Sequence, residues 1–344
     1  MKERATSIDI AHKAGVSQST VSRALRNSPL VSLETRNKIK AIAKQFNYKV
    51  DKNASNLRSQ LSGTIALLLF EEPTENDSHI NLFFLSMLSS VTRACAVNGY
   101  DLLVSFQQLS DDWHADYEDC HKADGIILLG YGDYTNYKEK LLKLEQQGTH
   151  FVRWGDAKED QPGLSIGCNN LLGGYEVAKH LISLNRHKIA FIGNISKGSP
   201  EFRDRFQGCC NALKKLSQYT MNSNTQFDAI ATEQSGYLAA QKLMASGEEF
   251  DAVFCACDLI AIGVMKALRE YSLQVPQDIS IVGFDDIPIA NFTRPALTTV
   301  QQDATLAGKL LVESILALIR DEPVKTTMLP SKLIIRGSCG WQQL

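Results

Sequence analysis

The chain has 344 residues, with 36 Lys and Arg against 38 Asp and Glu, so its net charge is close to zero. This length exceeds one typical hydrophobic core, and we expect two or three folding units. The sequence lacks an apolar run of the roughly eighteen residues that a membrane span needs, and its N-terminus has no signal-peptide core. Together these features predict a cytoplasmic protein without a membrane partner.

The near-zero total hides an asymmetry along the chain. Residues 1–60 carry twelve Lys and Arg against four Asp and Glu, whereas the remaining residues carry 24 against 34. A basic segment joined to an acidic body is typical of a nucleic-acid-binding module fused to a second domain.

An N-terminal stretch predicts a helix-turn-helix. Ile8, Ala11 and Ala14 would lie on the inner face of a first helix, which Gly15 ends with a left-handed residue. Ser17 then caps a second helix. The outer face of that helix carries amide, hydroxyl and guanidinium groups, which read base edges in the major groove. Its residues are Gln18, Ser19, Ser22 and Arg23.

A third helix begins after its expected cap, Ser32, and has apolar residues at helical spacing up to Phe46. The three helices would form an all-α head over residues 1–49. Residues 50–61 have the composition of a linker, in which Asp51 can cap a helix that is too short to be stable without a partner.

From residue 62 onward, apolar segments of strand length alternate with amphipathic helices. The expected strands are 64–70, 101–106, 124–130, 149–154, 188–193, 227–231, 251–257 and 279–284. The expected helices lie near 81–97, 111–121, 135–147, 171–184, 202–218, 233–246 and 259–271. This alternation predicts parallel sheets covered on both faces. Because the rhythm restarts after the helix near 171–184, we expect two similar lobes with a ligand cleft at the carboxyl ends of their strands.

Several stretches resemble one known family. IDIAHKAGVSQSTVSRAL (8–25) resembles, nearly letter for letter, the N-terminal signature of the LacI/GalR family of bacterial repressors. Gly-Phe-Asp-Asp (283–286) and the Leu-Thr-Thr (297–299) that follows it also match the family, and the resemblance covers nearly the whole chain. It implies an α/β fold class, with an all-α helix-turn-helix head, a hinge helix and a two-lobed periplasmic-binding-protein-like parallel-sheet domain over residues 62–344.

The resemblance also implies how the chain is divided. The N-lobe would comprise roughly residues 62–182 and 304–331, and the C-lobe roughly residues 183–303 and 332–344. The chain would cross between the lobes again near Thr299 and near Pro330.

The resemblance assigns DNA contacts to the head and to the linker. Base edges would be read by Gln18, Ser19 and Arg23. Phosphates would be contacted by hydroxyl-bearing residues and by one added arginine, namely Thr6, Ser22, Arg26, Ser32, Thr35 and Tyr48, and Ser17 is a further expected DNA contact. In the hinge helix, Ala54 precedes Leu57, which would wedge into the central base step of the minor groove. Val50-Asp51 and Ser55 depart from the Pro-Asn and Arg of the family, which removes a preset helix start and a phosphate contact.

The effector site is assigned in the same way. Asp285 directly follows a strand and could accept hydrogen bonds from ligand hydroxyls, whereas Asp286 could serve only as a cap. Arg205 would donate two hydrogen bonds to the ligand. Asn169 replaces an aspartate of the relatives, and Cys257 replaces an asparagine, so Cys257 would touch an apolar part of the ligand or none of it. The other expected site residues are Gln302 at a lobe crossing and the aromatic residues Phe83, Phe84 and Trp154, which are equally typical of a core.

The resulting hypothesis is a homodimeric or tetrameric repressor of a catabolic or transport operon, bound to a palindromic DNA operator and controlled by a small-molecule effector. A sugar or sugar phosphate is the expected effector, and either release or recruitment of the protein by it is compatible with the sequence. The alternatives are a purine- or nucleoside-responsive repressor, or a sugar-binding protein without a DNA-binding role.

Enzymatic and metal chemistry have little support in the sequence. No catalytic motif is present, so we expect neither an enzyme nor a cofactor. The eight cysteines show no metal-binding spacing and are expected as reduced thiols in the core.

Overall fold

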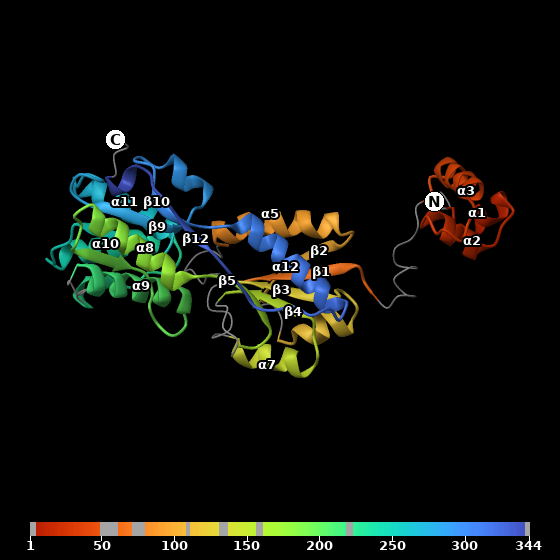
Figure 1. The fold of residues 1–344 in the computed structure, drawn as a ribbon, viewed down its shortest axis with the longest axis horizontal. Coiled ribbons are helices and arrows are strands. Elements are labelled where there is room, and N and C mark those ends of the chain that lie inside the picture. Colours follow the sequence, from red (N-terminus) through yellow and green to blue (C-terminus); the bar gives the residue numbers. More distant parts are fainter. Residues whose placement is uncertain are drawn as a thin grey trace. The chain divides into compact units, whose positions relative to one another are not determined.

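The computed structural model describes residues 5–48, 61–70, 80–107, 111–130, 137–155, 161–217 and 223–340. The chain divides into two compact units, Met1–Ser62 and Gly63–Leu344, which are described separately (Figure 1). The first unit contains the three predicted helices, α1 (Ser7–Ala14), α2 (Gln18–Leu25) and α3 (Leu33–Gln45). Ala54 and Leu57 of the expected hinge helix lie outside the described residues.

The caps of the head follow the sequence signals. Thr6 and Asp9 form a reciprocal capping box at the start of α1, and Gly15 ends that helix with a φ of 71°. Ser17 caps α2 and Ser32 caps α3. The small core consists of Ile10, Ala11, Ala14, Val21, Ala24, Val31 and Ile39.

Two core predictions for the head were wrong. Ile8 is 64% exposed, because Ile10 and Ala11 turn inward and a residue two positions before Ile10 lies on the opposite side of the helix. Phe46 is 41% exposed, because it follows the last residue of α3 as its C-cap.

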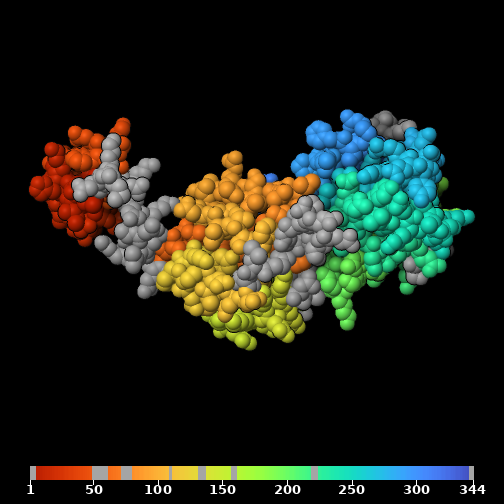
Figure 2. All heavy atoms as spheres, turned by 180° about the vertical axis from the view of Figure 1, so that it is seen from behind, coloured from red at the N-terminus to blue at the C-terminus, as the bar shows by residue number. Residues whose placement is uncertain are grey.

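The second unit contains two six-stranded sheets, one in each lobe, and the lobes follow one another along the length of this unit (Figures 1 and 2). The first sheet is parallel throughout and has the order β11-β5-β4-β3-β1-β2. Its strands are β1 (Thr64–Leu69), β2 (Asp101–Phe106), β3 (Gly125–Leu129), β4 (Phe151–Trp154), β5 (Leu164–Cys168) and β11 (Thr327–Leu329).

The second sheet has the order β12-β10-β9-β8-β6-β7, and β12 runs antiparallel to β10. Its strands are β6 (Ile189–Ile192), β7 (Gln226–Phe227), β8 (Ala252–Cys255), β9 (Ser280–Asp285), β10 (Thr298–Gln302) and β12 (Ser331–Ile334). The other strand pairs of this sheet are parallel, as the alternation of strands and helices predicts.

Helices cover both sheets. The first lobe carries α5 (Leu82–Val97), the π-helix η2 (His114–Asp119), α7 (Lys138–Gln146) and α12 (Ala304–Ile319), which lies beside α5 (Figure 1). The second lobe carries α8 (Asn170–Ser183), α9 (Pro200–Leu216), α10 (Glu233–Ala245), α11 (Asp258–Glu270) and the short turns η3 (Ser223–Thr225), η4 (Pro288–Phe292) and η5 (Gly337–Cys339).

The lobe boundary near residue 182 needs correction. Helix α8 packs tightly against α9 and also contacts β12, so it belongs to the C-lobe. Glycines allow this close approach, because a Cβ on Gly208 would lie 2.0 Å from the Leu171 carbonyl oxygen. The chain therefore crosses first between β5 and α8. It crosses back at Asp303, between β10 and α12, where the expected lobe ranges place the boundary and four residues after Thr299, and crosses a third time at Pro330 as expected.

Several elements differ from the prediction. Strand β5 was not predicted, because LSIGC has little apolar length, and the strands and the α-helix after residue 285, which are β10, α12, β11 and β12, were not predicted individually. The strand expected at 227–231 is reduced to β7, and the helix expected near 111–121 is the π-helix η2.

Candidate functional site

Helix α2 presents a polar face. Val21 is fully buried, and the exposed residues of the helix include Gln18, Ser19 and Arg23. The Gln18 side-chain amide donates to Ser7 Oγ at 2.7 Å, which ties the start of α2 to α1. The polar groups expected to read bases therefore share one exposed surface.

Three of the residues expected to contact DNA lie at helix ends. Thr6, Ser17 and Ser32 are the N-caps of the three helices. Helix N-termini attract anions through their free N–H groups and the helix dipole. Ser32 Oγ donates to Thr35 Oγ1 at 2.8 Å.

Two further residues of the head complete this set. Arg26 is exposed, and its guanidinium donates to Ser22 Oγ at 2.6 Å. Tyr48 is half-buried against the small core of the head.

In the second unit, Arg205 of α9 is fully buried among polar and aromatic partners. Its Nε donates to Asn170 Oδ1 at 2.9 Å, and its Nη1 donates to the Ala256 carbonyl oxygen at 2.5 Å. The guanidinium carbon lies 3.7 Å from the centre of the Phe284 ring. Nη1 also lies 3.5 Å from Asp285 Oδ1, so a buried cation meets a buried carboxylate at the end of β9.

Asp285 is the last residue of β9, and its φ of 113° lies in the left-handed region. Gln302, at the end of β10, donates from Nε2 to Asp285 Oδ1 at 2.6 Å. The structure thus brings together three residues predicted for the effector site, Arg205, Asp285 and Gln302.

The neighbouring Asp286 has a structural role. Its Oδ1 accepts from Arg336 Nη2 at 2.7 Å, and its Oδ2 accepts from Gln301 Nε2 at 3.0 Å. These bonds hold the C-terminal segment against the turn. They explain the presence of the second carboxylate, and no ligand is needed to explain it.

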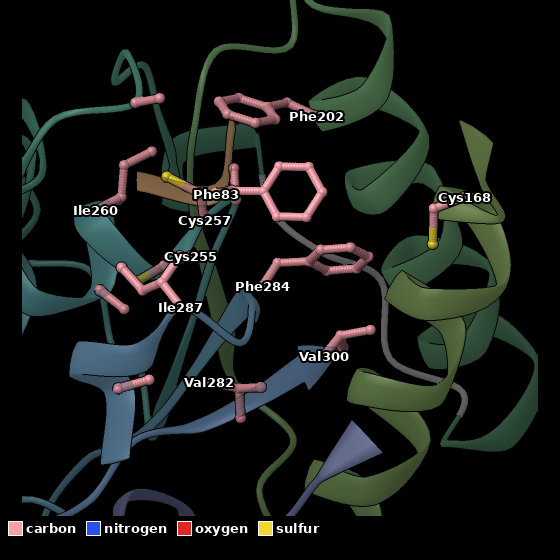
Figure 3. Close-up of a cluster of buried hydrophobic side chains, with 14 of the residues drawn as sticks. Phe83, Cys168, Phe202, Cys255, Cys257, Ile260, Val282, Phe284, Ile287 and Val300 are labelled. Atoms are coloured by element: carbon pink, nitrogen blue, oxygen red, sulfur yellow. The ribbon is translucent and has the colours of Figure 1, made fainter. Parts of the chain in front are cut away.

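The aromatic residues expected at the cleft are buried. Phe83 lies with its ring centre 5.4 Å from that of Phe84 and 5.6 Å from that of Trp154. Figure 3 shows the Phe83 ring, from α5 of the N-lobe, beside the rings of Phe202 and Phe284 of the C-lobe, and all three belong to one buried cluster. The charged cluster around Arg205 therefore adjoins an aromatic wall contributed by both lobes.

Two thiols border the same region. Cys257 precedes α11 and is fully buried, and Cys168 ends β5 (Figure 3). Burial raises the pKa of Cys168 to about 11 and raises the pKa of Cys257 well above its usual range. Both side chains are therefore neutral near pH 7 and act as small apolar groups, as expected for Cys257. All eight cysteines are free thiols, but Cys120 is exposed and Cys210 is only partly buried, so six of the eight lie in the core.

Other polar residues near the cluster form hydrogen bonds within the protein. Asn169 Oδ1 accepts from the Leu172 N–H at 2.9 Å and caps α8, whereas its neighbour Asn170 holds Arg205. Asn170 is buried, and its Nδ2 also donates to the Cys168 carbonyl oxygen. Arg153 of β4 donates from Nε to the Pro162 carbonyl oxygen, and the alternation of side chains along the strand places it on the sheet face opposite Trp154.

Sequence reasoning missed one more buried carboxylate, Asp258, at the first position of α11. Its Oδ1 accepts from Thr299 Oγ1 at 2.5 Å, and its Oδ2 accepts from the Ile287 N–H at 2.9 Å. Burial, and then the nearby Asp285, raise the pKa of Asp258 well above its usual range. Its match to the family pattern was visible in the sequence, but these partners lie up to 41 positions away.

Among the helices of the described ranges, none is long and apolar enough to cross a membrane. Within the same part of the chain, no group of three or more His, Cys, Asp and Glu side chains is arranged to hold a metal ion.

Comparison with known proteins identifies the family. A family model described as bacterial regulatory proteins, lacI family, matches residues 8–51. The probable HTH-type transcriptional repressor ExuR of Bacillus subtilis is 32% identical over 320 residues, which cover 92% of each chain. The chain belongs to the lacI family. This LacI-family protein is a DNA-binding transcriptional regulator and not an enzyme.

Other relatives and structures agree with this membership. The ribose operon repressor of Haemophilus influenzae is 31% identical over 97% of this chain and 98% of its own length. A second family model, described as a periplasmic binding protein-like domain, matches residues 178–339. The Lac repressor dimer bound to operator and anti-inducer is similar in fold, with a TM-score of 0.82 at 24% identity over 98% of this chain and 99% of that one. The complex of the regulator CelR with cellobiose has a TM-score of 0.69 at 24% identity over 97% and 100% of the two chains.

Proposed function

We propose that this LacI-family regulator is a homodimeric repressor whose operator affinity is controlled by a neutral sugar bound between its two lobes. The observation that carries the proposal is the buried cluster of Arg205, Asp285 and Gln302 at the carboxyl ends of β9 and β10. Relatives named as a ribose operon repressor and a cellobiose-bound regulator support a sugar.

The energetics of this cluster favour a binding role. Removing a guanidinium and a carboxylate from water costs several kcal/mol for each ion, and their mutual attraction only partly offsets this cost. Apolar side chains of the same volume would stabilise the lobe as well or better. A charged pair retained where α9 meets the carboxyl end of β9, beside aromatic side chains of both lobes, is typical of a ligand site.

The charge balance favours a neutral ligand over a sugar phosphate. The charge of Arg205 is matched by Asp285 at 3.5 Å, and Arg153 faces away from the aromatic wall. Sugar hydroxyls can donate to the Asp285 carboxylate and accept from Arg205 and Gln302. The apolar face of a sugar ring can pack on Phe83 or Trp154, and the neutral thiol of Cys257 adds a small apolar contact.

The head supplies the second half of the mechanism. Gln18, Ser19 and Arg23 share the exposed face of α2 and would read base edges, and two heads would occupy major grooves about one helical turn apart. The DNA contacts of Ala54 and Leu57 in the hinge remain a prediction from the sequence. An effector would alter operator binding through its different affinities for the states with and without paired hinges. We place this activity in the cytoplasm, where bacterial operators are found.

A purine or nucleobase is the second candidate effector. The PurR repressor of Vibrio vulnificus is 29% identical over 92% of this chain. The aromatic rings of Phe83, Phe84 and Trp154 could stack on a planar base, and Gln302 and Asp285 could pair with its edge. A sugar-binding protein without a DNA-binding role is not favoured, because the head matches the regulatory family.

A thermal-shift screen of the full chain tests the proposal, because a ligand that binds only the folded protein raises its melting temperature. The panel contains D-ribose, D-cellobiose, ribose 5-phosphate, glucuronate, adenine and hypoxanthine. We expect a neutral sugar to give the largest shift, and the shift should be lost in Asp285→Asn. A shift with a phosphate, a carboxylate or a nucleobase alone would reject a neutral sugar.

A further inference from the structure

The turn that carries Asp285 has an unusual backbone. Asp285 and Asp286 are consecutive, and both have a positive φ, 113° and 56°. Residues other than glycine populate this region sparsely and persist there only when their surroundings hold them. The carboxylate that faces Arg205 therefore depends on whatever fixes this turn.

Asp258 and Thr299 lie beneath the turn and bond to it. The Ile287 N–H, directly after the turn, donates to Asp258 Oδ2 at 2.9 Å. Thr299 Oγ1 donates to Asp258 Oδ1 at 2.5 Å and accepts from the Asp286 N–H at 3.4 Å. Both backbone N–H groups that follow Asp285 thus end on this pair of side chains.

The sheet is shaped to receive the Asp258 carboxylate. A Cβ on Gly283 of β9 would lie 2.2 Å from Asp258 Oδ1, so a side chain at this position would displace the carboxylate. The absence of a side chain there lets a residue of α11 reach across β9 to the turn.

We propose that Asp258 is a positioning residue of the effector site, which acts through Thr299 and the Ile287 N–H to hold the turn that directs Asp285 toward Arg205. This inference rests on the proposed role of Asp285. It adds a residue that the sequence did not assign to the site, and both of its carboxyl oxygens bond to the protein.

A role limited to capping α11 does not account for these contacts. The N-cap of α11 is Cys257, and its side chain makes no capping hydrogen bond. Both Asp258 oxygens accept hydrogen bonds from outside the helix, from the segment after β9 and from β10. Asp258 therefore links the helix to the two strands that carry Asp285 and Gln302.

The test compares two substitutions of Thr299, one that removes its hydroxyl and one that keeps it. Thr299→Val removes the hydroxyl at nearly constant shape, and Thr299→Ser keeps it. Crystal structures of both full-length proteins should show Asp285 leaving the left-handed region and separating from Arg205 in Thr299→Val but not in Thr299→Ser. Asp258→Asn, which replaces one acceptor oxygen with a donor, should give the same displacement and serves if Thr299→Val does not fold.

Calorimetric titration with D-ribose adds a functional measurement. If D-ribose binds the native protein, its affinity should fall about tenfold or more in Thr299→Val and return in Thr299→Ser. If D-ribose does not bind, the proposed sugar is in question, but the crystal structures still decide the role of Asp258. An unchanged Asp285 conformation in both Thr299→Val and Asp258→Asn would overturn the inference.

Discussion

Arg205 Nη1 and Asp285 Oδ1 lie 3.5 Å apart, and the side chains that carry them are 0% and 1% exposed. The two residues come from separate elements, α9 and the end of β9, and the guanidinium also stacks on Phe284. The two opposite charges therefore neutralise each other in a buried position, next to the aromatic wall between the lobes. The proposed effector control of this LacI-family regulator depends on this pair.

Removing Arg205 should destabilise the second unit. Arg205→Ala leaves Asp285 buried without its cation, and loss of one partner of a buried pair costs about 3–5 kcal/mol of unfolding free energy. Urea denaturation followed by fluorescence measures this change. Lys214→Ala, which removes an exposed cation from the same helix, is the matched control and should change stability by less than about 0.5 kcal/mol. Equal stability of both variants would contradict a buried charged pair.

Arg23 should determine base preference at one operator position. Arg23→Ala is expected to weaken binding to the preferred operator by about 1–3 kcal/mol and to relax the preference at one base pair of each half-site. Selection of bound sequences from random duplexes, followed by anisotropy titration, measures both effects. Lys44→Ala removes an exposed charge from α3 and should affect all duplexes alike. A uniform loss with Arg23→Ala would show that Arg23 contacts only phosphates.

Leu57 tests the hinge that the sequence predicts. Leu57→Ala should remove the bend of the operator, because an apolar wedge between base pairs is what unstacks and kinks the duplex. Energy transfer between dyes at the two duplex ends reports the bend, and Ser55→Ala is the control on the same segment. A normal bend with Leu57→Ala would exclude the wedge.

Stability should depend on pH through His150 and Glu118. His150 Nδ1 lies 2.6 Å from Glu118 Oε1, and this hydrogen bond raises the pKa of His150 above 6.5. A raised pKa in the folded state means that the stabilisation is fully present below the unfolded pKa and is lost as pH rises through the folded pKa.

The difference in unfolding free energy between the native protein and Glu118→Gln should therefore be larger near pH 6 than near pH 8.5. Urea denaturation at the two pH values gives this difference. Glu139→Gln, an exposed change on α7, should show no such dependence. A difference that is the same at both pH values would mean that the pair does not stabilise the protein through the charge of His150.

Regular elements were predictable where local signals are strong. Caps such as Ser17, Ser32 and Gly15 act within one turn of a helix, and the buried strands β1 and β3 are continuous apolar runs. Strand β5 escaped prediction because a short segment containing Ser and Gly is stabilised by its neighbours, β4 and β11, rather than by its own composition.

The candidate site was predictable only in part. Arg205, Asp285 and Gln302 follow from the family resemblance, and the structure brings them together. The choice between Asn169 and Asn170 depends on where α8 begins, since one position caps the helix and the next turns toward Arg205. The contacts of Asp258 depend on the approach of α11, β9 and β10, which no local pattern contains.

The measurement that tests the central claim most directly is operator binding by the full chain in the presence of each effector candidate, made in parallel with Asp285→Asn. The operator is first obtained by selection from random duplexes. We predict that a neutral sugar changes the operator Kd of the native protein by about tenfold or more, within the usual range of allosteric coupling, and leaves the Kd of Asp285→Asn unchanged. An equal response of both proteins, or no response to any neutral sugar, would contradict control through Arg205 and Asp285.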